Sequence, residues 1–364
     1  MKKGKTILEL AQEIELQRET KRDFVADTSA MEVTTKGELV LAGDKTRVIV
    51  GINDLAHDQI AEHTAIPKPY YKRMRQDAPE LLANNINTWF TKYPAPRMVR
   101  TLDVRCRAFL SSAFRPLENA DLAEAILPTL ANRKLNIMSC EITEKRLYIK
   151  AVDEQLFRDV PVGYKMGDGS HRIFDTCAPA IVVSNSEVGC GRLVVETGVY
   201  TRACTNMALF SDGGMRRTHV GARHRLLGDS VESIDHLLSD RTKRVTDQAL
   251  WLQVRDVVGA AFDETKLGRR VEQLTAAATN KITGSVEKVI ELTAREFSLS
   301  ETERSSVLRH LIEGGSLTQY GLHAAITRSA EDVDDYDRAT ELEYAGGRVI
   351  ELDRSAWERL AEAA

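Results

Sequence analysis

The apolar and polar positions of the first 95 residues change their period twice along the chain. Residues 6–22 place apolar side chains on roughly one stripe, which predicts an amphipathic helix. Residues 23–43 alternate as the two strands of a hairpin do, and residues 53–82 return to a helical period. We therefore expect residues 1–95 to form an N-terminal hairpin and helical subdomain.

From Arg97 onward the pattern is that of strands grouped around one helix. Two strands precede a helix that begins at Asn119, two more follow within residues 134–152, and two or three lie within residues 181–210. Strand pairs interrupted by a helix and a long loop are typical of an α+β fold with a mainly antiparallel sheet. We expect this central core, with its packed helices, to span residues 96–228.

Beyond residue 228 the apolar positions keep a helical period, so residues 229–364 are predicted to form a helical C-terminal region. Residues 296–364 carry 15 acidic and 7 basic side chains, whereas residues 1–295 carry 39 acidic and 43 basic side chains. The formal net charge of −4 therefore conceals a mildly basic body and an acidic tail. This division keeps nucleic acid open as a partner.

Composition narrows the class of protein. Of the 364 residues, 43% are hydrophobic and 29% are charged, which is ordinary for a soluble globular protein. No uncharged apolar run is long enough for a bilayer, and the N-terminus becomes charged before a signal-peptide core can form. We therefore expect a cytoplasmic protein with no membrane partner. Five cysteines show neither a C-x-x-C pair nor a histidine at ligand spacing, which predicts reduced and mostly buried thiols: Cys106, Cys140, Cys177, Cys190 and Cys204.

Residues 58–74 have the cadence of a helix-turn-helix. Ala61 lies on the first helix, and a break follows at residues 64–66. The second helix opens with two prolines and carries mostly aromatic and basic side chains: Pro67, Pro69, Tyr70, Tyr71, Lys72, Arg73 and Arg75. Such helix pairs more often pack a structural subdomain than read a major groove. A basic second helix can still touch phosphates without reading bases.

Patterns that would support catalysis or cofactor binding are weak. Ser170 and His171 are adjacent, so an extended chain directs them to opposite faces. Asp175, Glu187 and Glu196 are candidate ligands for a divalent metal, but no acid-x-acid spacing on one strand face supports them. The chain contains neither G-x-x-x-x-G-K-[ST] nor G-x-G-x-x-G. We predict no cofactor, no metal and no catalytic residue, and we favour a protein that is not an enzyme.

Arginine gives the clearest chemical pattern. Residues 97–115 hold five arginines against one acid, Asp103, and residues 216–225 hold four arginines, two histidines and no acid. Arg105 and Arg107 have the same parity, so a strand projects them from one face. Guanidinium groups match phosphate oxygens with forked donors. The alternative is that these arginines pair with acids elsewhere in the chain or across a subunit interface.

The segment SNSEVGCGRLVVETGVYTRACTNM, residues 184–207, places glycines inside a strand-rich region. Gly189 and Gly191 predict a bend or bulge between strands. Asn185 and Asn206 are predicted to fix turns at strand ends through hydrogen bonds from side chain to backbone.

Four motifs occur in order: RAFLSSAFRPLENADL, ITEKRLYIKAV, VVSNSEVGCGRLVVETGVYTRACTNM and RRTHVG. Together they resemble the phage- and plasmid-borne family defined by a domain of unknown function, DUF932, over about residues 50–230. Phe114 stands where a tyrosine is common, and Met207 stands where a glycine is common. The resemblance implies a role in DNA replication, recombination or host takeover. In outline, a basic sheet with a packed helix is also similar to phage single-strand annealing proteins, which hold a strand along a positively charged groove of an oligomer without ATP.

The leading hypothesis is a DNA-metabolism protein that binds single-stranded nucleic acid, most simply single-stranded DNA, through backbone contacts as a homo-oligomer. One alternative is an interaction or regulatory protein of a mobile element, and another is a metal-dependent nuclease. Seven arginines are predicted to contact phosphates: Arg105, Arg107, Arg115, Arg216, Arg217, Arg223 and Arg225.

Overall fold

The structure is a computed structural model. It describes residues 2–42, 47–165, 171–202, 206–210, 214–219, 223–225, 231–233 and 238–363. Two mainly antiparallel sheets carry helices on their faces, and the chain after them is helical, which confirms the predicted α+β class. No helix within these residues combines the length and the apolarity that a bilayer crossing requires.

The first sheet belongs to an N-terminal unit and has the strand order β1-β5-β6-β4-β3-β2. Its strands are β1 (Arg22–Asp27), β2 (Met31–Val33), β3 (Glu38–Ala42), β4 (Arg47–Ile52), β5 (Pro96–Leu102) and β6 (Arg105–Ser111). Helices cover one face: α2 (Asp54–His63), α3 (Lys68–Asp77) and α4 (Pro79–Lys92). The sequence pattern predicted β5 and β6 for the central core, but both strands hydrogen-bond in this sheet. Only the β4–β6 pair is parallel among its described pairings.

The second sheet has the central order β12-β11-β10-β8-β7, with β9 paired to β10 and β13 paired to β11. Its strands are β7 (Asn136–Ile142), β8 (Leu147–Val152), β9 (Arg158–Lys165), β10 (His171–Asn185), β11 (Leu193–Thr201), β12 (Asn206–Leu209) and β13 (Met215–Arg217). One face packs against α1 (Ile7–Thr20), α5 (Asn119–Asn132) and α6 (Asp240–Ala260). The predicted helix at Asn119 is therefore one of the elements that cover this sheet.

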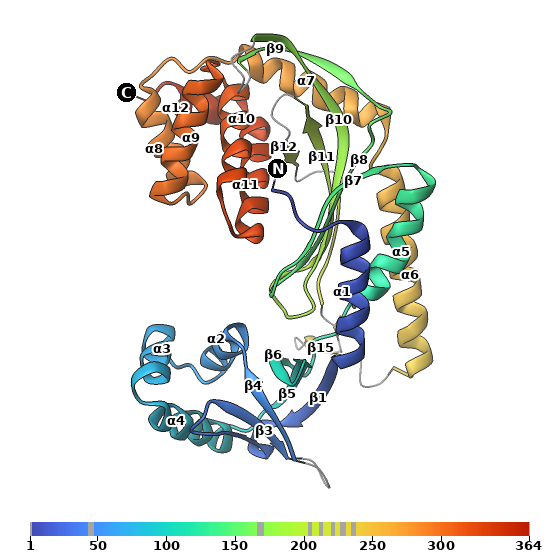
Figure 1. Ribbon diagram of the computed structural model, residues 1–364, viewed down its shortest axis with the longest axis vertical. Helices are drawn as coiled ribbons and strands as arrows, with labels where there is room; N and C mark the ends of the chain where they lie inside the picture. Colours follow the sequence, from blue (N-terminus) through green and yellow to red (C-terminus); the bar gives the residue numbers. More distant parts are fainter. Residues whose placement is uncertain are drawn as a thin grey trace.

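The C-terminal helices cover the opposite face of the second sheet and extend beyond it (Figure 1). They are α7 (Glu264–Thr279), α8 (Val286–Glu296), α9 (Glu301–Gly314), α10 (Gln319–Ser329), α11 (Tyr336–Glu351) and α12 (Arg354–Ala361). The acidic tail is part of this packing, because α11 lies against the sheet. Its Glu343 is fully buried and pairs with the equally buried Lys150 of β8, with 2.6 Å between Oε2 and Nζ. The Tyr148 hydroxyl donates to Asp337 of the same helix at 2.8 Å.

The two units lie one below the other and are joined on the side where α1 runs into β1 (Figure 1). A small additional pair, β14 (Arg223–Arg225) and β15 (Val231–Ser233), is antiparallel. The segment that follows β10, which is the glycine-containing stretch singled out in the sequence, lies at the junction between the units.

The hairpin turn between β5 and β6 holds a strained valine. Leu102 pairs with Arg105, so the turn consists of Asp103 and Val104, whose φ angles are 48° and 57°. Two-residue hairpin loops favour positive φ at both positions, but a β-branched residue rarely adopts it. The Val104 side chain is 78% exposed and so gains little from packing.

Val104→Gly is expected to raise the free energy of unfolding by about 1 kcal/mol. Left-handed backbone costs an L-residue roughly 1–2 kcal/mol, and the larger unfolded-state entropy of glycine offsets about 0.4–1 kcal/mol of that gain. Urea denaturation measures the change. Val25→Gly is the control, because Val25 is an exposed residue inside β1 and glycine there is expected to destabilise by about 0.5–1 kcal/mol. A V104G protein no more stable than the wild type would contradict the proposed strain.

Candidate nucleic-acid interface

Arg107, one of the predicted phosphate contacts, belongs to a charge network at the junction between the two units. Its Nη2 lies 2.6 Å from Oε2 of Glu187, whose side chain is only 1% exposed. The other oxygen of Glu187 accepts from Nζ of Lys21 at 2.7 Å and from the backbone N–H of Asn119, at the start of α5, at 2.7 Å. Glu187 thus accepts three hydrogen bonds, and Arg107 pairs with an acid of its own chain, which is the alternative to phosphate contact.

Arg100 extends the same network and is completely buried. Its guanidinium donates to Asp23 at 2.8 Å, to Glu118 and to the backbone carbonyl of Glu187 at 2.9 Å. Lys21 also reaches Glu118, at 2.8 Å. Three carboxylates thus face three cations in the junction network, which we define as Lys21, Asp23, Arg100, Arg107, Glu118 and Glu187. The network links β1, β5 and β6 of the first sheet to α5 and to the end of β10 of the second.

Burial alone would raise the pKa of Glu187, but the positive charges of Arg107 and Lys21 outweigh it and hold this pKa below its ordinary range. Burial raises the pKa of the neighbouring Glu118, and the negative charge of Glu187 adds to that rise. The two carboxyls therefore divide into one that is firmly ionised and one that protonates more readily. Because Glu187 stays charged, it can hold Lys21 and Arg107 together as a structural ion pair on each side.

The segment after β10 reaches across the junction with its backbone. Gln59 of α2 donates its side-chain amide to the carbonyl of Val188 at 2.8 Å and accepts from the N–H of Phe109 at 2.7 Å. Gly189 has φ of 79°, and a Cβ there would stand 2.6 Å from the side chain of Leu110. The predicted bend at the glycines is confirmed, and its reason is the close approach of two sheets.

Asn185 does not fix a local turn, contrary to the prediction. Its amide nitrogen donates to the carbonyl of Leu117 at 2.7 Å and to the side-chain oxygen of Asn119 at 2.8 Å. It therefore ties the end of β10 to the loop before α5. The side chain of Asn206 lies outside the described residues.

Arg115 and Arg216 are also held by acids of the same chain. Nη2 of Arg115 lies 2.7 Å from Oδ1 of Asp247 on α6 and 2.9 Å from the carbonyl of Lys243. Arg216 of β13 binds Glu196 of β11 through two nitrogens at 2.7 and 3.0 Å. Glu196 is almost fully buried, so this pair anchors β13 to the sheet.

Among the predicted contacts whose side chains the structure describes, Arg105 and Arg217 are both exposed and unpaired, whereas the exposed Arg216 is paired with Glu196. Neither Arg105 nor Arg217 forms a hydrogen bond or an ion pair with any residue that the structure describes. Arg105 opens β6 beside the strained hairpin turn, and Arg217 closes β13. Arg223 and Arg225 lie on β14, but their side chains fall outside the described residues. The two arginine-rich segments meet at Arg115 and Arg217, which line one cavity, whereas Arg105 belongs to β6 of the first sheet.

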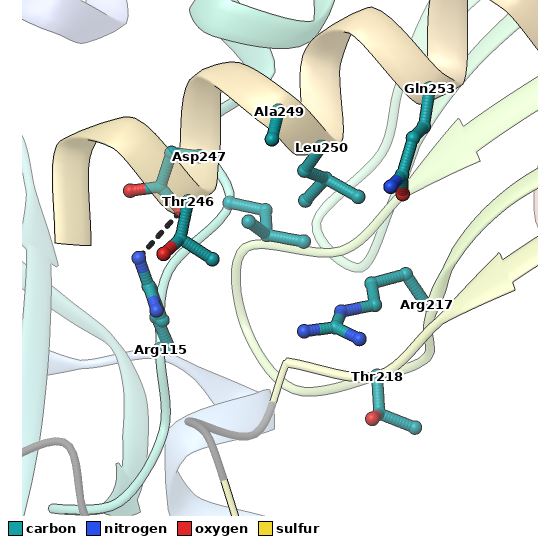
Figure 2. A pocket seen from close by; sticks show the side chains of 9 residues that line it. Arg115, Arg217, Thr218, Thr246, Asp247, Ala249, Leu250 and Gln253 are labelled. Carbon is teal, nitrogen blue, oxygen red and sulfur yellow. Dashed lines mark hydrogen bonds and ion pairs between the residues drawn. The ribbon is translucent and has the colours of Figure 1, made fainter. Parts of the chain in front are cut away.

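Arg217 lines a cavity of about 160 Å³ between β13 and α6 (Figure 2). Adjacent residues of a strand point to opposite faces, so Arg216 turns toward Glu196 while Arg217 turns toward α6. Figure 2 shows the guanidinium groups of Arg217 and Arg115 directed toward this space from two sides. The remaining lining is mixed polar and apolar: Leu117, Thr218, Thr246, Asp247, Ala249, Leu250 and Gln253.

The size and the donors of this cavity define what it can bind. Pockets for whole small molecules usually measure about 300–1,000 Å³, so this space suits a single functional group rather than a complete nucleotide. Arg217 and the amide of Gln253 are donors directed toward this space, whereas the side chain of Thr218 points away from it (Figure 2). Asp247 contributes negative charge but is engaged by Arg115. The arrangement can hold one anionic group through Arg217.

The three carboxylates considered as metal ligands do not converge. Glu187 sits in the junction network, Glu196 pairs with Arg216, and Asp175 accepts from the hydroxyl of Tyr320 at 2.6 Å. In the antiparallel register Glu196 lies opposite Val182, seven residues along β10 from Asp175. The described parts of the chain contain no group of three or more His, Cys, Asp or Glu side chains that is arranged to hold a metal ion.

The cysteine prediction is confirmed for the residues that the structure describes. Cys106, Cys140 and Cys177 are buried free thiols, and Cys190 is a half-buried one. Burial raises the pKa of the three buried thiols to about 12, so they are protonated and unreactive at neutral pH. Cys204 lies outside the described residues.

Sequence reasoning missed His219, which was placed only among the basic residues of its segment. Its ring is 5% exposed and stacks on Phe114 with 5.2 Å between ring centroids. Neither ring nitrogen has a hydrogen-bond partner among the described residues. Burial lowers the pKa of His219 to about 4, so the ring is neutral at pH 7 and adds no positive charge for a phosphate.

Lys21, Asp23 and Glu118 were also missed, because nothing in their local sequence distinguishes them from surface residues. Their roles depend on contacts with residues far along the chain. No protein-family model matches this chain, and no curated protein or solved structure matches it either. The resemblance to the DUF932 family therefore rests on the motifs quoted above and stays a prediction.

Proposed function

We propose that the protein binds single-stranded nucleic acid through its phosphate backbone, without ATP. The observation that supports this best is Arg217, an exposed guanidinium with no partner among the described residues, directed into a cavity with further polar donors. A planar guanidinium can donate two parallel hydrogen bonds to one phosphate. Arg105 offers a second accessible guanidinium on the N-terminal unit.

The proposed contact set is smaller than the seven arginines of the sequence prediction. Arg107, Arg115 and Arg216 are held by Glu187, Asp247 and Glu196. Glu187 and Glu196 are buried, so moving Arg107 or Arg216 to a phosphate would leave a charged carboxylate unpaired in the interior. Few contacts per chain give weak binding, and several linked chains on one strand multiply it. An annealing-like activity of a homo-oligomer, suggested by the similarity in outline to phage single-strand annealing proteins, is therefore part of the proposal.

Arg217→Ala is expected to weaken binding to a labelled single strand and to flatten its salt dependence. Each phosphate contact to a single strand contributes about 0.7 to the slope of log affinity against log salt concentration, so that slope should fall by about 0.7. Fluorescence anisotropy with an oligothymidylate between about 50 and 200 mM salt measures both quantities. Light scattering on the same samples reports whether the chains assemble.

The control is Arg354→Ala, which removes the same charge from an exposed position on α12. It should leave both affinity and slope unchanged. No binding by the wild type at low salt would overturn the proposal and favour the interaction-protein alternative. Equal losses in R217A and R354A would show that net charge, rather than the cavity, governs binding.

A further inference from the structure

The helices α2 and α3 are joined by a short turn, residues 64–67. Between His63 and Lys68 the chain reverses through Ala65, whose φ is 55°. The N–H of Ile66 donates to the carbonyl of Ala61 at 3.0 Å, a bond that closes the end of α2 when the following residue is left-handed. The sequence cadence that suggested two helices and a break at residues 64–66 is confirmed.

Buried side chains fix how the two helices pack. Ala61, a small residue where α2 meets α3, is completely buried, and Ile66, Tyr71 and Met74 are buried beside it against the first sheet. His57 and Tyr71 join the helices through a 2.8 Å hydrogen bond between Nδ1 and the hydroxyl. Because the inner face of α3 packs against α2 and the first sheet, the helix cannot rotate about its axis and its outer face points to solvent.

The outer face of α3 is exposed and basic. Lys68, Tyr70, Lys72, Arg73 and Arg75 are all exposed, so the ten residues of α3 present four cations against one acid. Figure 1 shows α3 at the outer edge of the N-terminal unit, away from α1 and the second sheet. An exposed helix held on a packed partner is the arrangement in which a second helix can enter a major groove.

The acids of the helix pair leave the middle of α3 open. Asp54 of α2 binds Arg75 at 2.6 Å, and Asp58 lies 3.7 Å from Lys68. Lys72 forms no hydrogen bond or ion pair with a described residue, and Arg73 has only a 3.8 Å surface contact with Asp77 on its own helix. Exposed pairs of that kind are weak. Lys72 and Arg73 are therefore the cations that a phosphate can most easily engage.

Arg105 lies near the same end of the helix pair. The β4–β6 register places it opposite Gly51, and Asn53, two residues later, caps α2 by accepting from the N–H of Ala56. A guanidinium beside the start of α2 adds a cation close to the end where Asp54 and Arg75 pair. Arg105 is therefore a further exposed cation near the start of α2.

We propose that α2–α3 docks on double-stranded DNA, with Lys72 and Arg73 of α3 facing the major groove and its phosphates. The proposal goes beyond single-strand binding, because it assigns a duplex to the N-terminal unit and leaves the Arg217 cavity to a single strand. The width of the major groove admits one α-helix, and the charge of α3 is opposite to that of the backbone. A protein that uses both the outer face of α3 and the Arg217 cavity can hold a duplex and a single strand at the same time.

The test compares duplex and single-strand binding of K72A/R73A. Loss of two phosphate contacts should lower the slope of log affinity against log salt concentration by about 1.8 for a duplex, with a correspondingly large loss of affinity at moderate salt. Binding to an oligothymidylate should stay unchanged. The probe is a labelled random-sequence duplex several helical turns long, in anisotropy titrations with the full chain.

The matched control is K288A/R295A, which removes two cations from the exposed face of α8. It should bind the duplex as the wild type does. Charge reversal in K72E/R73E should abolish duplex binding while the thermal midpoint stays unchanged. Wild-type duplex affinity in K72A/R73A, or equal losses in the control, would overturn the assignment. R217A separates the two proposals, since it should impair only the single strand.

Discussion

Replacement of Glu187 by glutamine is expected to lower the free energy of unfolding by about 3 kcal/mol. The change keeps the shape of the side chain and removes one charge. Arg107 and Lys21 would then face each other across a neutral amide, and both are too buried to regain full hydration. The backbone N–H of Asn119 would also lose its charged acceptor. The damage is concentrated at the junction between the two sheets.

Urea denaturation followed by far-UV circular dichroism measures this loss. Glu291→Gln is the matched control, because Glu291 also contacts two cations, Lys288 and Arg295, but does so on the surface of α8. Exposed ion pairs contribute about 0–1 kcal/mol, so that variant should stay close to the wild type. Equal stabilities of E187Q and E291Q would show that the junction network contributes little to folding.

The same carboxylate predicts how stability depends on acid. The folded-state pKa of Glu187 lies below its ordinary value of 4.5, so its contribution is present above pH 4.5 and is lost as the pH falls through the folded pKa. The raised pKa of Glu118 has the opposite sign and opposes this loss. The stability of the wild type should therefore fall below pH 4.5 more steeply than that of E187Q.

Lys150→Met is expected to cost about 3–5 kcal/mol, because it strands a buried charge. Lys150 and Glu343 are both completely buried, and Oε1 of Glu343 already has no hydrogen-bond partner among the described residues. The ammonium also lies 4.7 Å from the ring centroid of Tyr336, which adds a cation–π contact. The pair attaches α11 to the face of the second sheet, so its loss loosens the whole C-terminal region.

The double variant K150M/E343L should recover most of the loss. Replacing both members of a buried pair by apolar side chains of similar size is often neutral or stabilising. A double-mutant cycle on the free energies of unfolding measures the coupling. Additive losses in the single and double variants would contradict the proposed dependence of each charge on the other. Single-strand binding should be retained wherever the protein folds, since neither residue lines the Arg217 cavity.

Local pattern was a good guide to the elements and a poor guide to the arginines. The helix-turn-helix was visible in residues 58–74, because a break at residues 64–66 and two prolines, Pro67 and Pro69, separate two helical segments. Whether an arginine is paired with an acid or remains free for a ligand leaves no such pattern in the local sequence. Arg107 finds its acid 80 residues away, and Arg115 finds one 132 residues away. For these two arginines, a short segment of sequence therefore never contains both the arginine and the acid that pairs with it.

The sequence by itself determined the α+β class, the helical C-terminal region, the buried thiols, the bend at Gly189 and the helix pair α2–α3. Each of these follows from the period of apolar residues, from backbone freedom or from composition within a short segment. Only the tertiary structure decided that β5 and β6 join the first sheet, that the acidic tail packs against the second, and which arginines remain accessible. The first outcome depends on strand pairing and apolar packing between segments far apart in the chain. The other two depend on which charges meet in low-dielectric surroundings, where a buried charge must be paired because leaving it unpaired costs several kcal/mol.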